Sequence, residues 1–87
     1  MEAARGMIVR SGAGRDKGKL MVILEIDGDF ALLADGKERK LAKPKRKRIK
    51  HLKTTNTLLN AGDLEDITDK RLREIIRSNP KKAAEEV

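Results

Sequence analysis

Two clusters of cationic side chains dominate the chemistry that this sequence could perform. The first surrounds three glycines in "VRSGAGRDKGKL", where glycine permits positive φ and close approach of the backbone. The second is the run "KPKRKRIK", which ends just before the single histidine. Lys, Arg and backbone N–H groups are the groups that contact phosphate oxygens. The residues that we expect to contact a polyanion are Arg10, Ser11, Gly12, Arg15, Lys17, Gly18, Lys19, Lys43, Lys45, Arg46, Lys47, Arg48, Lys50 and His51.

The positive charge of the chain is concentrated in one segment. The formal net charge is +7, and residues 37–53 carry ten Lys or Arg against one Glu, so this segment accounts for the whole excess. A block of this kind is an electrostatic footprint for a polyanion. The alternative is a disordered basic run that only solubilises the chain.

Composition excludes several classes of site. A chain of 87 residues forms one small domain, which buries only ~60% of the surface of its unfolded chain. Without cysteine there is no disulfide, thiolate metal site or cysteine nucleophile. One aromatic residue among 87 argues against a deep enzyme pocket, and a single histidine against a two-histidine metal site or a Ser-His-Asp triad. We therefore expect no catalytic activity, no cofactor and no metal.

Two further motifs lack the required spacing. "GRDKGKL" has the wrong count between its glycines for a phosphate-binding P-loop, and it lacks the hydroxyl residue after the lysine. The carboxylates from Asp63 to Glu74 lack the central glycine of a calcium-binding loop. We interpret these carboxylates as helix-capping and charge-balancing groups. The sequence also shows neither a signal peptide nor an apolar run of membrane-spanning length, so we expect a cytoplasmic protein.

The apolar pattern predicts a mainly β fold. The run "LMVILEI" is rich in β-branched and aliphatic residues, and we place Leu20, Val22, Leu24 and Ile26 on the core face. Asp27-Gly28-Asp29 predicts a hairpin turn, and Asp35-Gly36 repeats its chemistry. Such a meander of short strands indicates a small barrel of about five antiparallel strands, with Phe30 in its core. The expected strands lie near residues 6–11, 20–26, 30–34, 39–42 and 48–52.

The barrel is expected to occupy residues 1–54 and to be followed by a linker at 55–65, a short C-terminal α-helix at 66–79 and a frayed tail at 80–87. Thr68 fits the helix N-cap, and Ile67 with Leu72 fits a hydrophobic staple. Leu72, Ile75 and Ile76 form one apolar stripe, which we expect to dock on the barrel because a helix of this length is marginal alone.

The segment "IVRSGAGRDKGKLMVILEI" resembles the KOW motif of ribosomal proteins and transcription elongation factors, with Gly18 at the characteristic glycine. The continuation "LLADGKERKLAKPKRKRIKHLKTTN" is similar to small bacterial KOW-domain RNA-binding proteins, which themselves resemble a eukaryotic and archaeal large-subunit ribosomal protein family. The likeness covers roughly residues 5–78. It implies an SH3-like barrel, RNA binding and a ribosome-linked role, with the basic loop and the basic run facing RNA.

Two functional hypotheses follow. In the first, the protein is a non-catalytic module that binds structured ribosomal RNA through phosphate contacts, with ribosomal proteins as possible neighbours, no membrane partner and a monomeric free state. In the second, it is an adaptor of the translation or transcription machinery that grips a protein through the barrel edge or the C-terminal helix.

Overall fold

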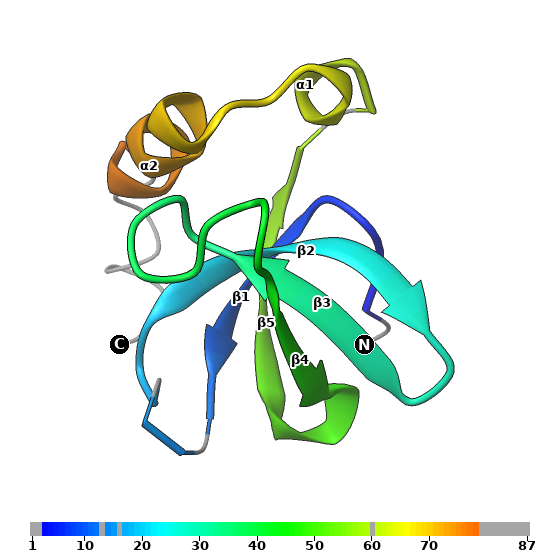
Figure 1. Cartoon of the computed structure of the whole chain (residues 1–87). Coiled ribbons are helices and arrows are strands. Elements are labelled where there is room, and N and C mark those ends of the chain that lie inside the picture. The colour runs from blue at the N-terminus through cyan, green and yellow to red at the C-terminus, as the bar shows by residue number, and fades with distance from the viewer. Residues whose placement is uncertain (1–2, 13, 16, 60, 79–87) are drawn as a thin grey trace.

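Five antiparallel strands form one curled sheet, a half-barrel of the SH3-like kind (Figure 1). The computed structural model describes residues 3–12, 14–15, 17–59 and 61–78. The order of the strands across the sheet is β4, β3, β2, β1, β5. Their bounds are β1 (Met7–Ser11), β2 (Leu20–Asp27), β3 (Phe30–Ala34), β4 (Lys45–Arg48) and β5 (Leu52–Leu58). The expected mainly β fold with a short C-terminal helix is confirmed.

Two of the expected strands lie elsewhere. Residues 39–42 belong to the loop between β3 and β4. There the Asp35 carboxylate accepts hydrogen bonds from the backbone N–H groups of Lys37 and Arg39, at 2.8 and 2.9 Å. Such a local bond removes a donor that a strand needs for its ladder. Pairing with β3 begins only at Lys45, directly after Pro44.

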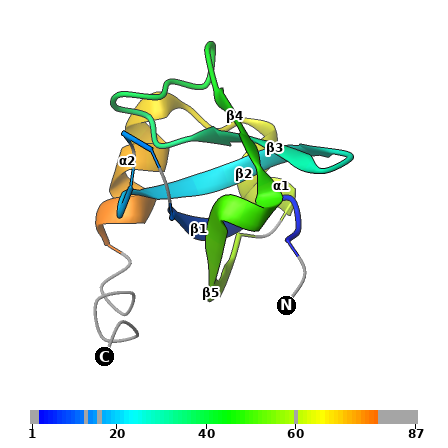
Figure 2. The ribbon, with the colours of Figure 1, turned by 90° about the horizontal axis from the view of Figure 1, so that it is seen from below.

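The strand expected at 48–52 is also displaced. Most of that segment is a 3-10 turn, η1 (Ile49–His51), which joins β4 to β5 at one end of the barrel (Figure 2).

The expected linker at 55–65 is wrong, because it contains the second half of β5 and a short helix, α1 (Ala61–Glu65). β5 pairs with β1 from Ser11↔Leu52 to Met7↔Leu58. The Thr55 hydroxyl donates to the carbonyl oxygen of Ile8 at 2.7 Å in a buried position. Threonine is β-branched and favours strands despite its polarity. The barrel therefore extends to Leu58.

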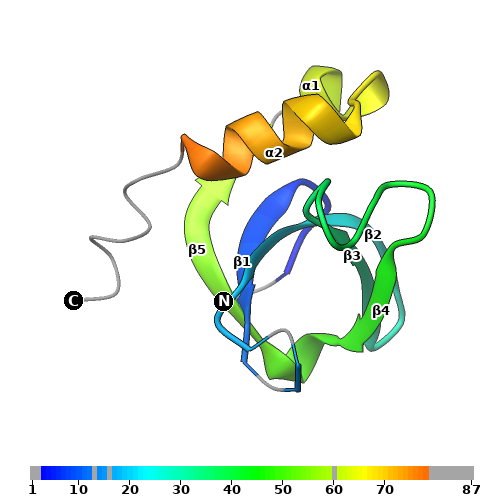
Figure 3. The same cartoon turned by 60° about the vertical axis from the view of Figure 1, so that its left-hand side comes forward.

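The central strands are buried on both faces of the sheet. Each face carries its own apolar cluster. Val9, Met21, Ile23, Ala31 and Leu33 fill the inside of the curled sheet. On the other face, the second cluster includes Ile8, Val22 and Ala34, with Leu64 of α1 and Leu72 of α2. Figure 3 shows both helices covering this second face.

The expected one-sided core of β2 is therefore only partly right. Leu20, Val22 and Leu24 do belong to the cluster under the helices, but Leu20 and Leu24 are only partly buried. Met21 and Ile23 are fully buried on the opposite face. A continuous apolar run is typical of a strand that is covered on both sides. Ile26 is 37% exposed, because the register shifts between Ile23 and Glu25 and the strand then leaves the covered region.

The C-terminal helix α2 (Asp69–Arg77) packs on the sheet as expected, with Leu72 fully buried and Ile75 and Ile76 against the same cluster. Thr68 is its N-cap, and the Thr68 hydroxyl accepts from the backbone N–H of Arg71 at 3.1 Å. Ile67 lies in the same cluster as Leu72, as the staple requires. The expected frayed tail lies outside the described residues. Within those residues, no helix has the length and apolarity to cross a membrane.

Three contacts fasten α2 to the loop after β3. The Arg73 guanidinium donates to the carbonyl oxygen of Gly36 at 2.7 Å, and the Asp69 carboxylate accepts from the backbone N–H of Leu41 at 2.8 Å. Gly36 has a φ of 79° and lies directly against the backbone of Asp69. A Cβ atom there would lie closer to the Asp69 carbonyl oxygen than van der Waals contact permits.

Gly36→Ala is expected to destabilise the protein more than Gly28→Ala. Both glycines have positive φ, but a Cβ atom at Gly28 would meet no atom within 4 Å. Gly28→Ala therefore costs about 1 kcal/mol of backbone strain. Gly36→Ala adds a backbone clash with α2 and should cost about 1–3 kcal/mol more. Urea unfolding followed by far-UV circular dichroism measures both, and equal losses would show that Gly36 is not needed for docking of α2.

Candidate polyanion-binding surface

The hairpin between β1 and β2 lies against the basic run, although the two are far apart in sequence. The backbone N–H of Gly12 donates to the carbonyl oxygen of His51 at 2.8 Å. The Lys47 ammonium donates to the Ser11 hydroxyl at 2.9 Å. These contacts join the described parts of residues 11–19 to residues 43–51, and we call their combined surface the barrel-end surface.

The hairpin owes its shape to its glycines. Gly14 and Gly18 have φ of 79° and 87°. The backbone N–H of Gly18 donates to the Ser11 carbonyl oxygen at 2.7 Å, and that of Lys17 donates to the Gly14 carbonyl oxygen at 3.1 Å. A Cβ atom on Gly12 would lie 2.8 Å from the His51 carbonyl oxygen, so a side chain there would push the hairpin away from η1. The expected close backbone approach is confirmed at Gly12.

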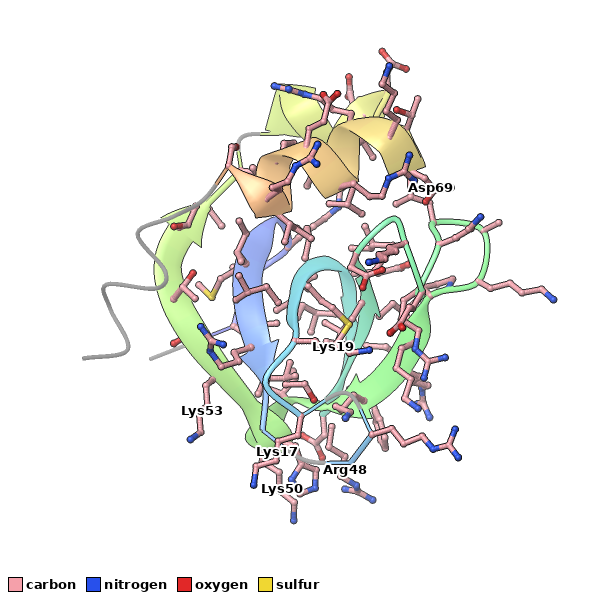
Figure 4. The ribbon with its side chains drawn as sticks, turned by 90° about the vertical axis from the view of Figure 1, so that its left-hand side faces the viewer. Lys17, Lys19, Arg48, Lys50, Lys53 and Asp69 are labelled. Atoms are coloured by element: carbon pink, nitrogen blue, oxygen red, sulfur yellow. The ribbon has the colours of Figure 1, made fainter. Side chains whose placement is uncertain are left out.

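Most of the predicted contact residues reach solvent. Figure 4 shows Lys17, Arg48 and Lys50 at one end of the barrel, with Lys53 of β5 beside them. The exposed members of the predicted set are Arg15, Lys17, Gly18, Lys19, Lys43, Arg46, Arg48, Lys50 and His51. Arg10, Gly12, Lys45 and Lys47 are half-buried. Ser11 is only 1% exposed, so its hydroxyl positions Lys47 rather than facing a ligand.

The ring of Phe30 contacts the guanidinium groups of two arginines of β4. Phe30 is half-buried rather than in the core, and the guanidinium carbons of Arg46 and Arg48 lie 3.8 and 4.9 Å from the centre of its ring. The pairing Phe30↔Arg48 and the two-residue period of β4 place both arginines beside the ring. Sequence reasoning missed this role of Phe30, although the alternation of "KRKR" opposite a strand that begins with Phe is a signal for it.

Exposed ion pairs occupy some of the predicted contact residues. Lys19 pairs with Glu38, and Arg46 lies 3.7 Å from Asp27. All four side chains are between 43% and 74% exposed. Ion pairs this exposed are worth little, so a phosphate could displace either carboxylate.

The barrel-end surface combines cations whose backbone positions are set by the fold with one exposed imidazole. Among the described residues, no group of three His, Cys, Asp or Glu side chains could hold a metal ion. Cations on a rigid strand and a glycine-shaped hairpin can bind extended anions, since their spacing is set by the fold. The chain matches no protein-family model and no curated protein.

A double-mutant cycle should detect the contact between Phe30 and Arg46. Phe30→Leu keeps an apolar side chain but removes the ring, and Arg46→Met removes the charge. The coupling energy in urea unfolding should be about 0.5–1 kcal/mol, as for exposed cation–π pairs. The control cycle pairs Phe30→Leu with Lys53→Met on β5, where the coupling should be near zero. Equal coupling in both cycles would exclude a specific contact with Arg46.

Proposed function

We propose that this protein is a non-catalytic, cytoplasmic RNA-binding protein that associates with the ribosome by contacting structured ribosomal RNA through the barrel-end surface. Lys and Arg side chains neutralise neighbouring phosphates there and release their counterions. In this proposal the free protein is a monomer, and the KOW-like hairpin supplies part of the contact surface. Ribosomal proteins are neighbours in the assembled complex.

The convergence of the hairpin and the basic run carries this proposal. The 2.8 Å bond from Gly12 to His51 and the 2.9 Å bond from Lys47 to Ser11 bring the two basic segments together. A basic run that served only solubility would need neither a paired strand nor a fixed neighbour. Instead, β4 pairs with β3 over all four of its residues, so the positions of its cations are set. Positioned cations are suited to a phosphate backbone of defined shape.

This surface is better suited to contact the phosphates of a structured RNA than to stack with unpaired bases. Single-strand-binding proteins stack bases on exposed aromatic rings. Here the one ring of the chain, Phe30, already has Arg46 and Arg48 beside it. Double-stranded RNA is recognised mainly through its backbone and 2′-hydroxyls, which a surface of Lys and Arg can contact.

The adaptor hypothesis receives less support. Its apolar contact would be the stripe of Leu72, Ile75 and Ile76 on α2. In the structure that stripe packs against the sheet, and Leu72 is fully buried. Ile75 and Ile76 are half-buried. A partner protein could reach the whole stripe, Leu72 included, only if α2 left the sheet, and the contacts at Gly36 and Leu41 oppose that movement.

Charge removal at the barrel-end surface should reduce the salt dependence of RNA binding. For about five phosphate contacts, the slope of log K against log salt is near −4. Lys17→Gln with Lys50→Gln changes two exposed side chains and should flatten the slope by about 1.5. A fluorescein-labelled RNA hairpin measures this by anisotropy. The control is Lys70→Gln with Arg71→Gln on α2, which removes the same charge and should leave the slope nearly unchanged.

Equal flattening in both variants would indicate attraction by net charge alone, without a defined surface. An unchanged slope in Lys17→Gln with Lys50→Gln would remove the barrel-end surface from the interface.

The ribosomal part of the proposal predicts co-sedimentation. Tagged protein in a cell lysate should migrate with the large ribosomal subunit or its precursors in a low-salt sucrose gradient, and it should dissociate in high salt. The Lys17→Gln, Lys50→Gln protein should dissociate at lower salt than the control variant. Protein that stays at the top of the gradient in low salt would contradict ribosome association.

A further inference from the structure

A second cationic surface lies between the β1–β2 hairpin, the loop after β3 and helix α2. It is an open groove of about 940 Å³, and we call it the α2 groove. Its cationic lining residues come from three elements that are separate in sequence. They are Arg10, Lys19, Lys37, Lys40, Arg73 and Arg77.

The charge of the α2 groove is strongly unbalanced. Among the described residues that line it, six cations face two carboxylates, those of Asp35 and Glu38. The Asp35 carboxylate is already bonded to the backbone N–H groups of Lys37 and Arg39. Glu38 pairs with Lys19 across the groove. Cations that line one concave surface focus their potential and attract an anionic ligand.

The mixed lining of the groove suits a sugar–phosphate chain. Leu20 and Ile76 also line it, and both are partly buried in the cluster under α2. Phosphates pair with the cations of such a lining, whereas ribose carbons tolerate its apolar side chains. The position of Arg73 is fixed by its 2.7 Å bond to the Gly36 carbonyl oxygen, and Arg77 lies one turn further along the same helix.

The α2 groove is continuous with the barrel-end surface through the hairpin. Ser11 and Gly12 contact the basic run, whereas Arg10, Gly18 and Lys19 of the same hairpin line the groove. The Arg10 guanidinium donates to the Gly18 carbonyl oxygen at 2.9 Å, which links the strand to the far side of the hairpin. In Figure 4, Lys19 lies between the cluster of Lys17, Arg48 and Lys50 and helix α2.

We propose that the α2 groove binds a second segment of the RNA backbone, so that one RNA crosses the hairpin and contacts both surfaces. This inference rests on the proposed RNA-binding function and gives α2 a binding role in addition to its packing role. Glu38 acts as an internal competitor, because a phosphate that binds at Lys19 competes with its carboxylate.

Two sets of variants test the groove. Lys37→Gln with Arg77→Gln changes two exposed groove residues, and it should flatten the salt slope by about 1.5 on a long RNA hairpin. On a stem too short to reach from the barrel end to the groove, the slope should stay unchanged. Lys70→Gln with Arg71→Gln, on the same helix but outside the groove, is the control for net charge.

Removal of the Glu38 carboxylate should strengthen RNA binding, whereas removal of groove cations should weaken it. Glu38→Gln removes the carboxylate that pairs with Lys19 and is expected to raise the affinity for the long hairpin about two- to five-fold in low salt. Glu65→Gln on α1 adds the same net charge away from the groove and should change the affinity little. If both variants gain the same affinity, the gain comes from net charge alone. The role of Glu38 as a competitor is then overturned.

The outcomes separate this inference from the proposed function. If Lys37→Gln with Arg77→Gln binds like the wild type while Lys17→Gln with Lys50→Gln is weakened, the groove inference fails and the RNA-binding proposal stands. If the wild type does not bind either RNA, both fail. If polyglutamate binds the wild type and loses affinity only in the groove variant, while RNA binding is unaffected, the groove takes an acidic protein segment and the inference is overturned.

Discussion

The structure depends on burial of the central strands on both faces. Val9, Met21 and Ile23 face the inside of the curled sheet, while Ile8, Val22 and Ala34 face the helices. A domain of 87 residues can bury only a modest fraction of its surface, so neither cluster alone would be large. Coverage of the second face by α2 therefore contributes part of the core itself. This explains why the loop after β3 is tied to α2 by both backbone and side-chain contacts.

Because the apolar residues occupy the strands, the cations are displaced to a hairpin, an edge strand and the outer side of a helix. These elements meet around the β1–β2 hairpin, whose two sides face different neighbours. Ser11 and Gly12 contact the basic run, and Arg10 and Lys19 line the groove under α2. One short hairpin thus organises two charged surfaces, which explains why so many glycines and cations precede the most apolar segment of the chain.

Much of the fold follows from local patterns in the sequence. The Asp-Gly turns, the run from Leu20 to Leu24 and the Thr68 cap are each determined by nearby residues, so they are predictable. The strand in the threonine-rich segment was missed because its pairing with β1 is a long-range contact without an apolar signal. The loop at 39–42 depends on Asp35, which competes for backbone donors that a strand would use.

The sequence indicates the basic segments of the candidate site but not how they are arranged in space. The glycine-bearing loop and the basic run are visible in the sequence as composition. Their mutual contact was not predictable, since it depends on a bond between Gly12 and His51 that only the folded sheet creates. The groove depends on the packing angle of α2, which no local pattern encodes. Sequence reasoning thus located the cations but could not divide them between two surfaces.

The position of β4 at the edge of the sheet has a consequence for self-association. An edge strand presents unpaired backbone groups that another chain can extend into a larger sheet. All four residues of β4 are Lys or Arg, so a second copy that paired edge to edge here would place like charges opposite each other. Such pairs are destabilising. The cations of β4, which belong to the proposed polyanion-binding surface, therefore also protect this open edge against aggregation.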